Sequence, residues 1–231
     1  MLNNNNKMTH NSDEFVEWLL QTGKIKEIDL DKFKARKLVQ LGNYEFVYFD
    51  LETTQYIPGQ QGRTEKIIEI GAVHRDQKFS TLVNPGIPIE NSIIHKINND
   101  DVINAPNIVN ALNALISWLP QDKTVILIAH NGAAFDRKIL QRDLTSLNIQ
   151  VPMNILLADS LYPISKIVDA KDKKLESLYK KLFGEEYIER HRAFEDSIDL
   201  RCVCEKAEKL SNKDLINIFE NYIYCVYLQD I

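Results

Sequence analysis

The sequence predicts an α/β protein: a mixed five-stranded sheet flanked by helices, with a small helical N-terminal extension. Two observations predict this class. Short segments rich in β-branched and aromatic residues recur along the chain, and later they alternate with segments whose apolar residues have helical spacing. Three early strands followed by such an alternation are typical of a mixed sheet with helices on both faces.

Five segments have the composition and length of strands. The first, YEFVYFDL, is a dense β-branched and aromatic run that is too short for a buried helix and typical of a central strand. The second and third are joined by the tight connection HRDQ and form a β-meander, whereas the last two each follow a predicted helix. The strands are expected at 44–51, 66–73, 78–85, 124–130 and 154–160.

Apolar residues at helical spacing, with stop residues beside them, predict the helices. Gly42, Pro120 and Gly184 each lie just beyond one such stretch. Helices are expected after Ser12, over 30–41, 108–119, 135–147, 175–183 and 194–210, and near the C-terminus from Leu215, Phe219, Tyr222, Ile223 and Val226. We therefore expect a tail and helical extension over 1–43, a domain over 44–210, and a C-terminal helix packed on that domain over 211–231.

The composition narrows the class of protein. The 231 residues include only 8 Gly and 7 Pro, which excludes collagen-like and low-complexity chains. A net charge of −5 excludes a basic protein that coats nucleic acid by bulk charge. Cys202, Cys204 and Cys225 form neither a disulfide framework nor a CxxC metal site. No apolar run could span a membrane or serve as a signal core, so we expect a soluble, intracellular protein.

Two acids lie two residues apart at the end of the first strand. The strand period points Asp50 and Glu52 to the same face. Two converging carboxylates repel each other, and one takes up a proton unless a cation lies between them. Carboxylate oxygens are the ligands that Mg²⁺ and Mn²⁺ prefer. A solvated acidic strand end would contain the same residues, so this pair alone leaves both interpretations open.

Two further acidic segments follow. HNGAAFD comes after the fourth strand and places Asp136 in a first helical turn, where an acid could also serve only the helix dipole. HRAFED places His191 before a helix and Asp196 at its start, although a lone histidine there could be an ordinary surface residue. Strand ends and helix starts gather at one rim of an α/β sheet. Taken together, the four carboxylates predict a divalent-metal site unlike a structural zinc site.

FDLETT, HNGAAFD and HRAFED, in this order, resemble the three motifs of the DnaQ-like 3′–5′ exonucleases of the DEDDh subgroup. KIIEIGAV, FSTLVNPGIPI, IIHKI and the NAP turn also resemble connecting sequence of that family, so the resemblance covers roughly 44–208. The resemblance implies an RNase H-like fold. It also implies hydrolysis of phosphodiester bonds at nucleic-acid 3′ ends with two divalent ions, Mg²⁺ or Mn²⁺, and release of 5′-mononucleotides.

The resemblance also implies roles for individual residues. His191 matches the general base, and imidazole can accept a proton from water near neutral pH. The catalytic set also includes the four carboxylates that match the metal ligands: Asp50, Glu52, Asp136 and Asp196. The resemblance implies that four further residues contact the terminal nucleotide: Leu51, Thr53, His95 and Asn131. Each could instead have only a structural role, in packing or in fixing a turn.

The sequence is compatible with three functions for this fold. An exonuclease would act on single-stranded or frayed 3′ ends, with DNA the favoured substrate and RNA the alternative. A non-catalytic nucleic-acid-binding or polymerase-docking module, or an RNase H-type endonuclease, would share the fold. The extension over 1–43 could bind a polymerase or another protein, and no membrane contact is expected. The lysines between 166 and 181 are expected to form a solvated helix face, with Arg190 and Arg192 attracting phosphate.

Overall fold

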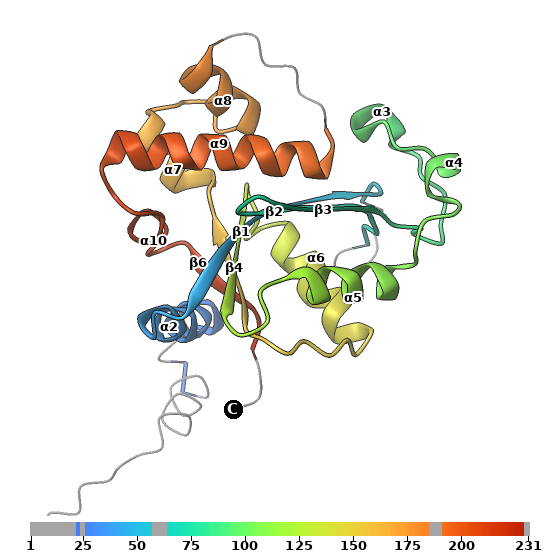
Figure 1. The fold of residues 1–231 in the computed structure, drawn as a ribbon, viewed down its shortest axis with the longest axis horizontal. Helices are drawn as coiled ribbons and strands as arrows, with labels where there is room; N and C mark the ends of the chain where they lie inside the picture. The colour runs from blue at the N-terminus through green and yellow to red at the C-terminus, as the bar shows by residue number, and fades with distance from the viewer. Residues whose placement is uncertain (1–21, 24–25, 57–63, 185–190, 229–231) are drawn as a thin grey trace, which may run out of the picture.

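The computed structural model describes residues 22–23, 26–56, 64–184 and 191–228, which form a sheet covered by helices (Figure 1). The described elements are, in chain order, α2 (Glu27–Gln40), β1 (Tyr44–Thr53), β2 (Ile67–His74), β3 (Gln77–Leu82), α3 (Ser92–His95), α4 (Asn99–Val102), α5 (Ile108–Trp118), β4 (Thr124–Ala129), α6 (Asp136–Ser146), β5 (Ile155–Asp159), α7 (Leu161–Val168), α8 (Leu175–Phe183), α9 (Ala193–Ser211), α10 (Leu215–Ile218) and β6 (Ile223–Tyr227).

The strands form one sheet in the order β3-β2-β1-β4-β5-β6. β1, β4 and β5 run parallel, while β2 and β3 continue the sheet antiparallel on one side and β6 pairs antiparallel with β5 on the other. Every residue of β4 and β5 is buried, as expected for apolar parallel strands covered on both faces. The predicted mixed sheet with helices on both faces is confirmed.

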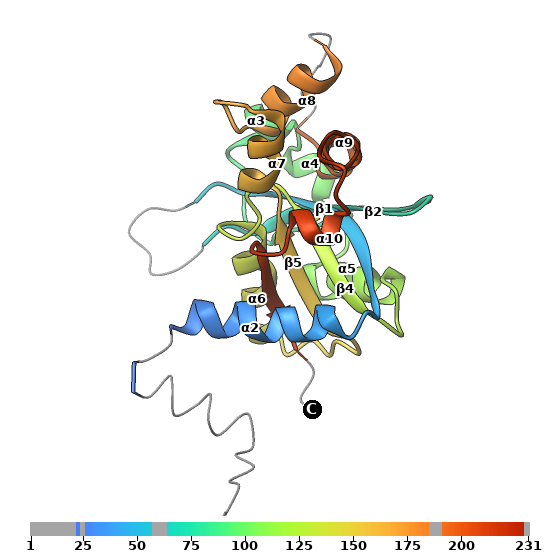
Figure 2. The same cartoon turned by 90° about the vertical axis from the view of Figure 1, so that its left-hand side faces the viewer.

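A separate hydrophobic core lies on each face of the sheet. α5 and α6 cover one face, and α7, α8, α9 and α10, together with α2, cover the other (Figures 1 and 2). β1 contributes to both cores, because Val47 and Phe49 pack toward α5 and α6 whereas Tyr48 packs on the other face. Since side chains alternate along a strand, Asp50 and Glu52 share the face of Tyr48, which α9 covers.

A small third cluster supports the segment that carries α3 and α4. The side chain of Asn98 caps α4, and the carboxylate of Asp101 accepts a hydrogen bond from the Asn98 N–H at 2.8 Å. The amide of Asn91 donates to the carbonyl of Thr53 at 3.1 Å and so ties this segment to the end of β1. The cluster itself consists of Ile68, Ile89, Ile97 and Val102.

The sheet has six strands rather than the predicted five, and the predicted C-terminal helix over 211–231 is wrong. In the described part of this segment, α9 ends at Ser211, Leu215–Ile218 forms the short helix α10, and Ile223–Tyr227 pairs with β5 as β6. The apolar residues with helical spacing in this segment belong to two different elements. IYCVY is β-branched and aromatic, and its pairing satisfies backbone groups that a free sheet edge would expose. The sheet therefore extends beyond the predicted domain boundary at residue 210.

The N-terminal extension is described only in part. Its second predicted helix is confirmed as α2, which packs against β6. The guanidinium of Arg137 in α6 donates to the carboxylate of Asp31 in α2 at 2.7 Å, which attaches α2 to the body of the fold. The tail, the helix predicted after Ser12 and most of the loop predicted over 55–64 lie outside the described residues.

Candidate active site

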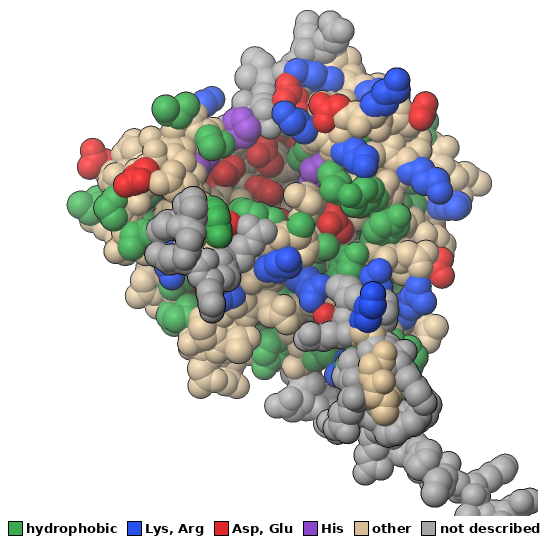
Figure 3. Space-filling view, turned by 180° about the vertical axis from the view of Figure 1, so that it is seen from behind, with side chains coloured by type: hydrophobic (Ala, Val, Ile, Leu, Met, Phe, Trp, Pro, Cys, Tyr) green, Lys and Arg blue, Asp and Glu red, His purple; other side chains and the backbone are tan. Residues whose placement is uncertain are grey.

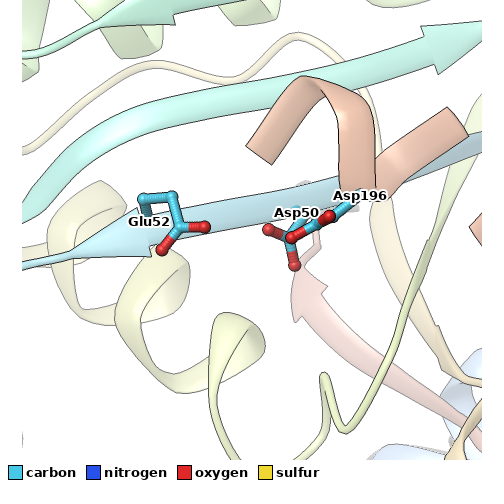
Figure 4. A group of neighbouring side chains, drawn as sticks. All are labelled: Asp50, Glu52 and Asp196. Atoms are coloured by element: carbon cyan, nitrogen blue, oxygen red, sulfur yellow. The ribbon is translucent and has the colours of Figure 1, made fainter. Parts of the chain in front are cut away.

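Three carboxylates from two elements converge on the face of the sheet that α9 covers. Asp50 and Glu52 come from β1, and Asp196 comes from the first turn of α9 (Figure 4). One oxygen of each carboxylate lies within 4.8 Å of the corresponding oxygens of the other two. The strand period therefore places Asp50 and Glu52 on one face as expected, and the fold brings Asp196 to them.

Asp136 approaches the same group from the second acidic segment. It begins α6 and is 2% exposed. The turn before it needs special backbone geometry, since Asn131 has a φ of 60° and a Cβ on Gly132 would lie 2.6 Å from the Cβ of Ala129. Asp136 is not one of the three carboxylates within 4.8 Å, but its charge raises the pKa of Asp50. It therefore lies beside the cluster rather than within it.

Burial and mutual repulsion raise the pKa values of the β1 acids. Burial is the largest cause for Asp50, whose pKa lies well above its ordinary value, and the charges of Asp136 and Glu52 add to it. Burial also raises the pKa of Glu52 to about 8, with the charge of Asp196 as the next cause. The carboxylates therefore tend to hold protons at neutral pH, and a cation bound between them would displace those protons.

The donor set fits a hard divalent cation. The three converging groups are all carboxylates, and such oxygens suit Mg²⁺ and Mn²⁺ better than they suit zinc. The raised pKa values report negative charge that the surrounding protein does not neutralise, which is the condition that a divalent ion relieves. Asp50, Glu52 and Asp196 would hold the ion, and the charge of Asp136 beside them would add to its attraction.

A buried acid on β2 fixes the start of α9. Glu69 is 1% exposed, and its carboxylate accepts hydrogen bonds from the guanidinium of Arg192 at 2.9 and 2.7 Å and from the N–H of Ala193 at 3.0 Å. Gly71 lies two residues further along β2, where a Cβ would come within 2.1 Å of the carbonyl carbon of Ala193. Glu69 and Gly71 together hold the first turn of α9, and hence Asp196, against the carboxylates of β1.

The sequence interpretation did not single out Glu69, although a signal was present. KIIEIGAV is an apolar strand with one acid at its centre, and a buried acid is rare unless it is paired. Its partner changes the interpretation of Arg192, because the guanidinium that was expected to attract phosphate is bound to Glu69. Arg190 lies outside the described residues.

His191 lies directly before this anchored turn. Its φ is 49°, its side chain is half-buried, and Arg192 follows it immediately. His191 is close enough to His95 of α3 for its charge to contribute to lowering the pKa of that buried ring, for which burial is the main cause. The residue predicted as general base therefore lies at the same end of α9 as Asp196.

The family model described as Exonuclease matches residues 47–199, a span that includes all four predicted carboxylates and His191. The chain belongs to this exonuclease family. Its six-stranded sheet with helices on both faces is the RNase H-like fold that the resemblance implied.

Individual exonucleases resemble the chain to different degrees. Exonuclease DPD1 of Arabidopsis thaliana, a chloroplastic/mitochondrial protein, is 35% identical over 190 residues, which cover 72% of this chain and 58% of that protein. The nuclease domain of 3′hExo, a DEDDh family member bound to rAMP, has a TM-score of 0.60 and 16% identity over 74% of this chain and 93% of that one. Exonuclease X with 5′ overhanging duplex DNA has a TM-score of 0.54 and 22% identity over 76% of this chain and 98% of that one.

Side chains from β5 and the segment after it hold the second exonuclease motif in place. Asp159 is 5% exposed and accepts hydrogen bonds from the N–H groups of Ala133 at 3.0 Å and Leu161 at 2.9 Å. His130 Nε2 lies 2.7 Å from the carbonyl oxygen of Lys173, which can only accept, so Nε2 carries a proton. Burial lowers the pKa of His130, and its neutral ring can then accept at Nδ1 from the Ser160 hydroxyl at 2.8 Å.

The predicted substrate-contacting residues lie in different environments. Leu51 is 4% exposed within the core beneath α5 and α6, so little of its side chain is available to a nucleotide. Thr53 is 8% exposed at the end of β1, and His95 is 1% exposed with Nδ1 accepting from the N–H of Ile97. Asn131 is exposed in its left-handed turn, a conformation that asparagine tolerates. Their contacts with a nucleotide stay predictions.

Among the helices that the structure describes, none is long and apolar enough to cross a membrane. The intracellular location expected from the sequence stays a prediction.

Proposed function

We propose that this chain is a 3′–5′ exonuclease that removes 5′-mononucleotides from single-stranded or frayed 3′ ends, using two divalent ions, Mg²⁺ or Mn²⁺. The observation that supports this most strongly is the convergence of Asp50, Glu52 and Asp196 within 4.8 Å. Strongly raised carboxylate pKa values are typical of catalytic sites rather than of passive binding surfaces. The cluster therefore favours an enzyme over a non-catalytic module of the same fold.

In the proposed reaction the chain's own residues position the reactants and move one proton. When bound by the carboxylates, the divalent ions would lower the pKa of the attacking water and stabilise charge on the leaving oxygen. His191 accepts a proton from the attacking water while the water oxygen forms a bond to the phosphorus of the 3′-terminal nucleotide. The bond between that phosphorus and the 3′ oxygen of the preceding nucleotide then breaks. That oxygen takes up a proton, which leaves a shortened strand with a 3′ hydroxyl and a 5′-mononucleotide.

The Glu69–Arg192 pair has an indirect part in this reaction. Because it fixes the first turn of α9, it sets the position of Asp196 relative to Asp50 and Glu52. His191 directly precedes Arg192, so the same pair restrains the residue that we propose as the general base. We propose DNA as the favoured substrate and RNA as the alternative. Both are considered because only a few pocket contacts with the 2′-hydroxyl distinguish RNA from DNA.

The test is a ladder assay on matched DNA and RNA oligonucleotides. Each strand carries its label at the 5′ end in one reaction and at the 3′ end in another, with Mg²⁺, Mn²⁺ or EDTA present. We expect 5′-labelled strands to shorten one nucleotide at a time and 3′-labelled strands to release a labelled mononucleotide at once. Cleavage of a circular strand would instead indicate an endonuclease. Absence of cleavage with both metals would contradict the proposal.

A further inference from the structure

The α7–α8 segment carries a net positive charge in a chain that is acidic as a whole. Residues 161–184 contain three acids and six lysines, a net charge of +3 in a chain of net charge −5. Within the described residues, Lys166, Lys171 and Lys174 are exposed and form no ion pair. We call this surface the basic wall, defined by Lys166, Lys171, Lys173, Lys174, Lys180 and Lys181.

The basic wall is attached directly to the candidate active site. In the parallel register of β1 and β4, Tyr48 lies opposite Ile128, which places His130 just past β4 at the level of Asp50. The ring of His130 donates to the carbonyl of Lys173, so the connection between α7 and α8 is held within roughly two strand spacings, about 10 Å, of Asp50. α7 and α8 also pack against α9, which carries Asp196.

The basic wall also offers an aromatic surface. Tyr162 of α7 is 54% exposed, and the Lys173 ammonium lies 4.3 Å from the centroid of its ring. This cation–π contact holds a positive charge and an exposed aromatic face side by side. Proteins that bind single-stranded nucleic acid combine these two features, because phosphates pair with lysines while bases stack on aromatic rings.

The side of the site opposite the basic wall exposes apolar side chains. α3 is tied to the end of β1, on the β2 side of the carboxylates, and exposes Ile93 (93%) and Ile94 (55%). Figure 3 shows acidic side chains in a hollow, with histidine side chains at its edge and lysine and arginine side chains to the right of it and below it. Isoleucine side chains cannot bind phosphate, and Lys96 at the end of α3 is the exposed cation of that helix, so the larger group of lysines beside the site is the basic wall.

From these positions we infer that the basic wall binds the phosphates of the substrate strand upstream of its 3′ end, with Tyr162 receiving one of the bases. The inference rests on the proposed exonuclease activity. It extends the substrate-binding surface from the 3′-terminal nucleotide to the nucleotides on its 5′ side. A long strand therefore gains binding that a dinucleotide, which has one phosphodiester, does not. The lysines predicted from the sequence to be a solvated helix face become part of the substrate-binding surface.

The test compares two double variants with the same change in charge. Lys171→Gln/Lys174→Gln alters the basic wall, and Lys34→Gln/Lys37→Gln alters two exposed lysines of α2, at the other end of the molecule (Figure 2). KM and kcat are measured for a dinucleotide and for a single strand of about 20 nucleotides between about 50 and 200 mM salt. For the long strand, the dependence of log KM on log salt should weaken by about 1.4 in the basic-wall variant, about 0.7 per lysine. The dinucleotide kinetics should not change.

Equal behaviour of the two double variants on the long strand would overturn the inference, and so would a parallel rise in KM for the dinucleotide. If the wild type hydrolyses neither substrate, the proposed function fails by itself. Fluorescence anisotropy of the same labelled strand then still decides the question. Weaker binding by the basic-wall variant than by the α2 variant supports the inference, and equal affinities overturn it.

Discussion

At the residue scale, the candidate site is a set of acids placed where the folded chain cannot neutralise them. Asp50 and Glu52 have raised pKa values because they are buried and lie beside other carboxylates. Such crowding lowers the free energy of unfolding in the absence of a cation. The stability of the chain should therefore respond strongly to metal binding. A change in one carboxylate should therefore affect activity and stability in opposite directions.

Asp50→Asn should reduce divalent-dependent hydrolysis by at least about 10³-fold, because it removes a ligand oxygen and the charge that attracts the cation. The free energy of unfolding in EDTA at pH 8 should rise, since one crowded charge is gone. Single-turnover rates and thermal melting measure the two effects. Asp76→Asn, in the exposed β2–β3 turn, is the control and should change neither quantity. Turnover like that of the wild type in Asp50→Asn would remove Asp50 from the metal site.

His191→Ala should lower kcat by about 10²–10⁴-fold while leaving Mn²⁺ affinity nearly unchanged, because the ring moves a proton and does not bind the ion. Calorimetric titration with Mn²⁺ and single-turnover kinetics separate these quantities. Added imidazole should restore part of the lost rate. His74→Ala is a matched control. His74 is the last residue of β2 and contacts Glu45 and Trp118, away from Glu69 and the start of α9. A loss of metal affinity equal to the loss of rate would instead make His191 a ligand.

At the element scale, the site depends on contacts between segments that are distant in the sequence. The alternation of apolar residues predicts β1 and the common face of Asp50 and Glu52 without reference to any other segment. The anchor of α9 cannot be found in this way, because Glu69 and Arg192 lie 123 residues apart in the chain. β6 escapes prediction for a similar reason, since its five residues form a strand only through pairing with β5.

Glu69→Gln tests whether the anchor positions the catalytic end of α9. Removing the charge leaves Arg192 without its ionic partner, and we expect a loss of about 1–3 kcal/mol in the free energy of unfolding. We also expect a fall in kcat at temperatures where the variant is fully folded, because His191 and Asp196 lose their fixed positions. Chemical denaturation and single-turnover kinetics measure the two effects.

The matched control for the anchor is Glu205→Gln on the same helix. Glu205 pairs with Arg201 at 2.6 Å, but this pair is only half-buried and its residues are four apart on one helix, so its loss should cost less than about 0.5 kcal/mol and leave kcat unchanged. If Glu69→Gln loses stability yet keeps the kcat of the wild type, the pair supports the fold without positioning the site.

At the scale of the whole molecule, a group of carboxylates and a group of lysines lie in neighbouring regions of the fold. The net charge of −5 includes the carboxylates of the site, whereas residues 161–184 carry +3. Composition alone excludes coating of nucleic acid by bulk charge and says nothing about this separation, which arises only when α7 and α8 fold beside β4. The fold class was predictable because hydrophobic periodicity reports each element locally. The distribution of charge around the site was not, because it depends on tertiary packing.

The stability of the whole domain without metal should depend on pH through the same carboxylates. The pKa of Glu52 rises from 4.5 to about 8 on folding. Below about pH 4.5 the group is protonated in both the folded and the unfolded chain, so its contribution to stability is fully present. Between about pH 4.5 and 8 only the folded chain keeps the proton, and the free energy of unfolding falls as pH rises. Asp50 acts in the same direction.

Glu52→Gln should therefore be more stable than the wild type at pH 8 in EDTA and should differ from it little at pH 5. One pKa unit corresponds to about 1.4 kcal/mol, and about 1 kcal/mol shifts the Tm of a domain of this size by roughly 2–4 °C, so we expect a gain of at least about 3–5 °C at pH 8. Saturating Mn²⁺ should reverse the order by stabilising the wild type more than the variant, because ion binding displaces the protons that the crowded acids hold. Thermal melting of both proteins across this pH range, with EDTA and with Mn²⁺, checks these expectations. A Tm difference that is the same at pH 5 and pH 8 would show that Glu52 does not titrate in the folded protein between those values, and the metal-free site would then not be the electrostatically strained cluster described above.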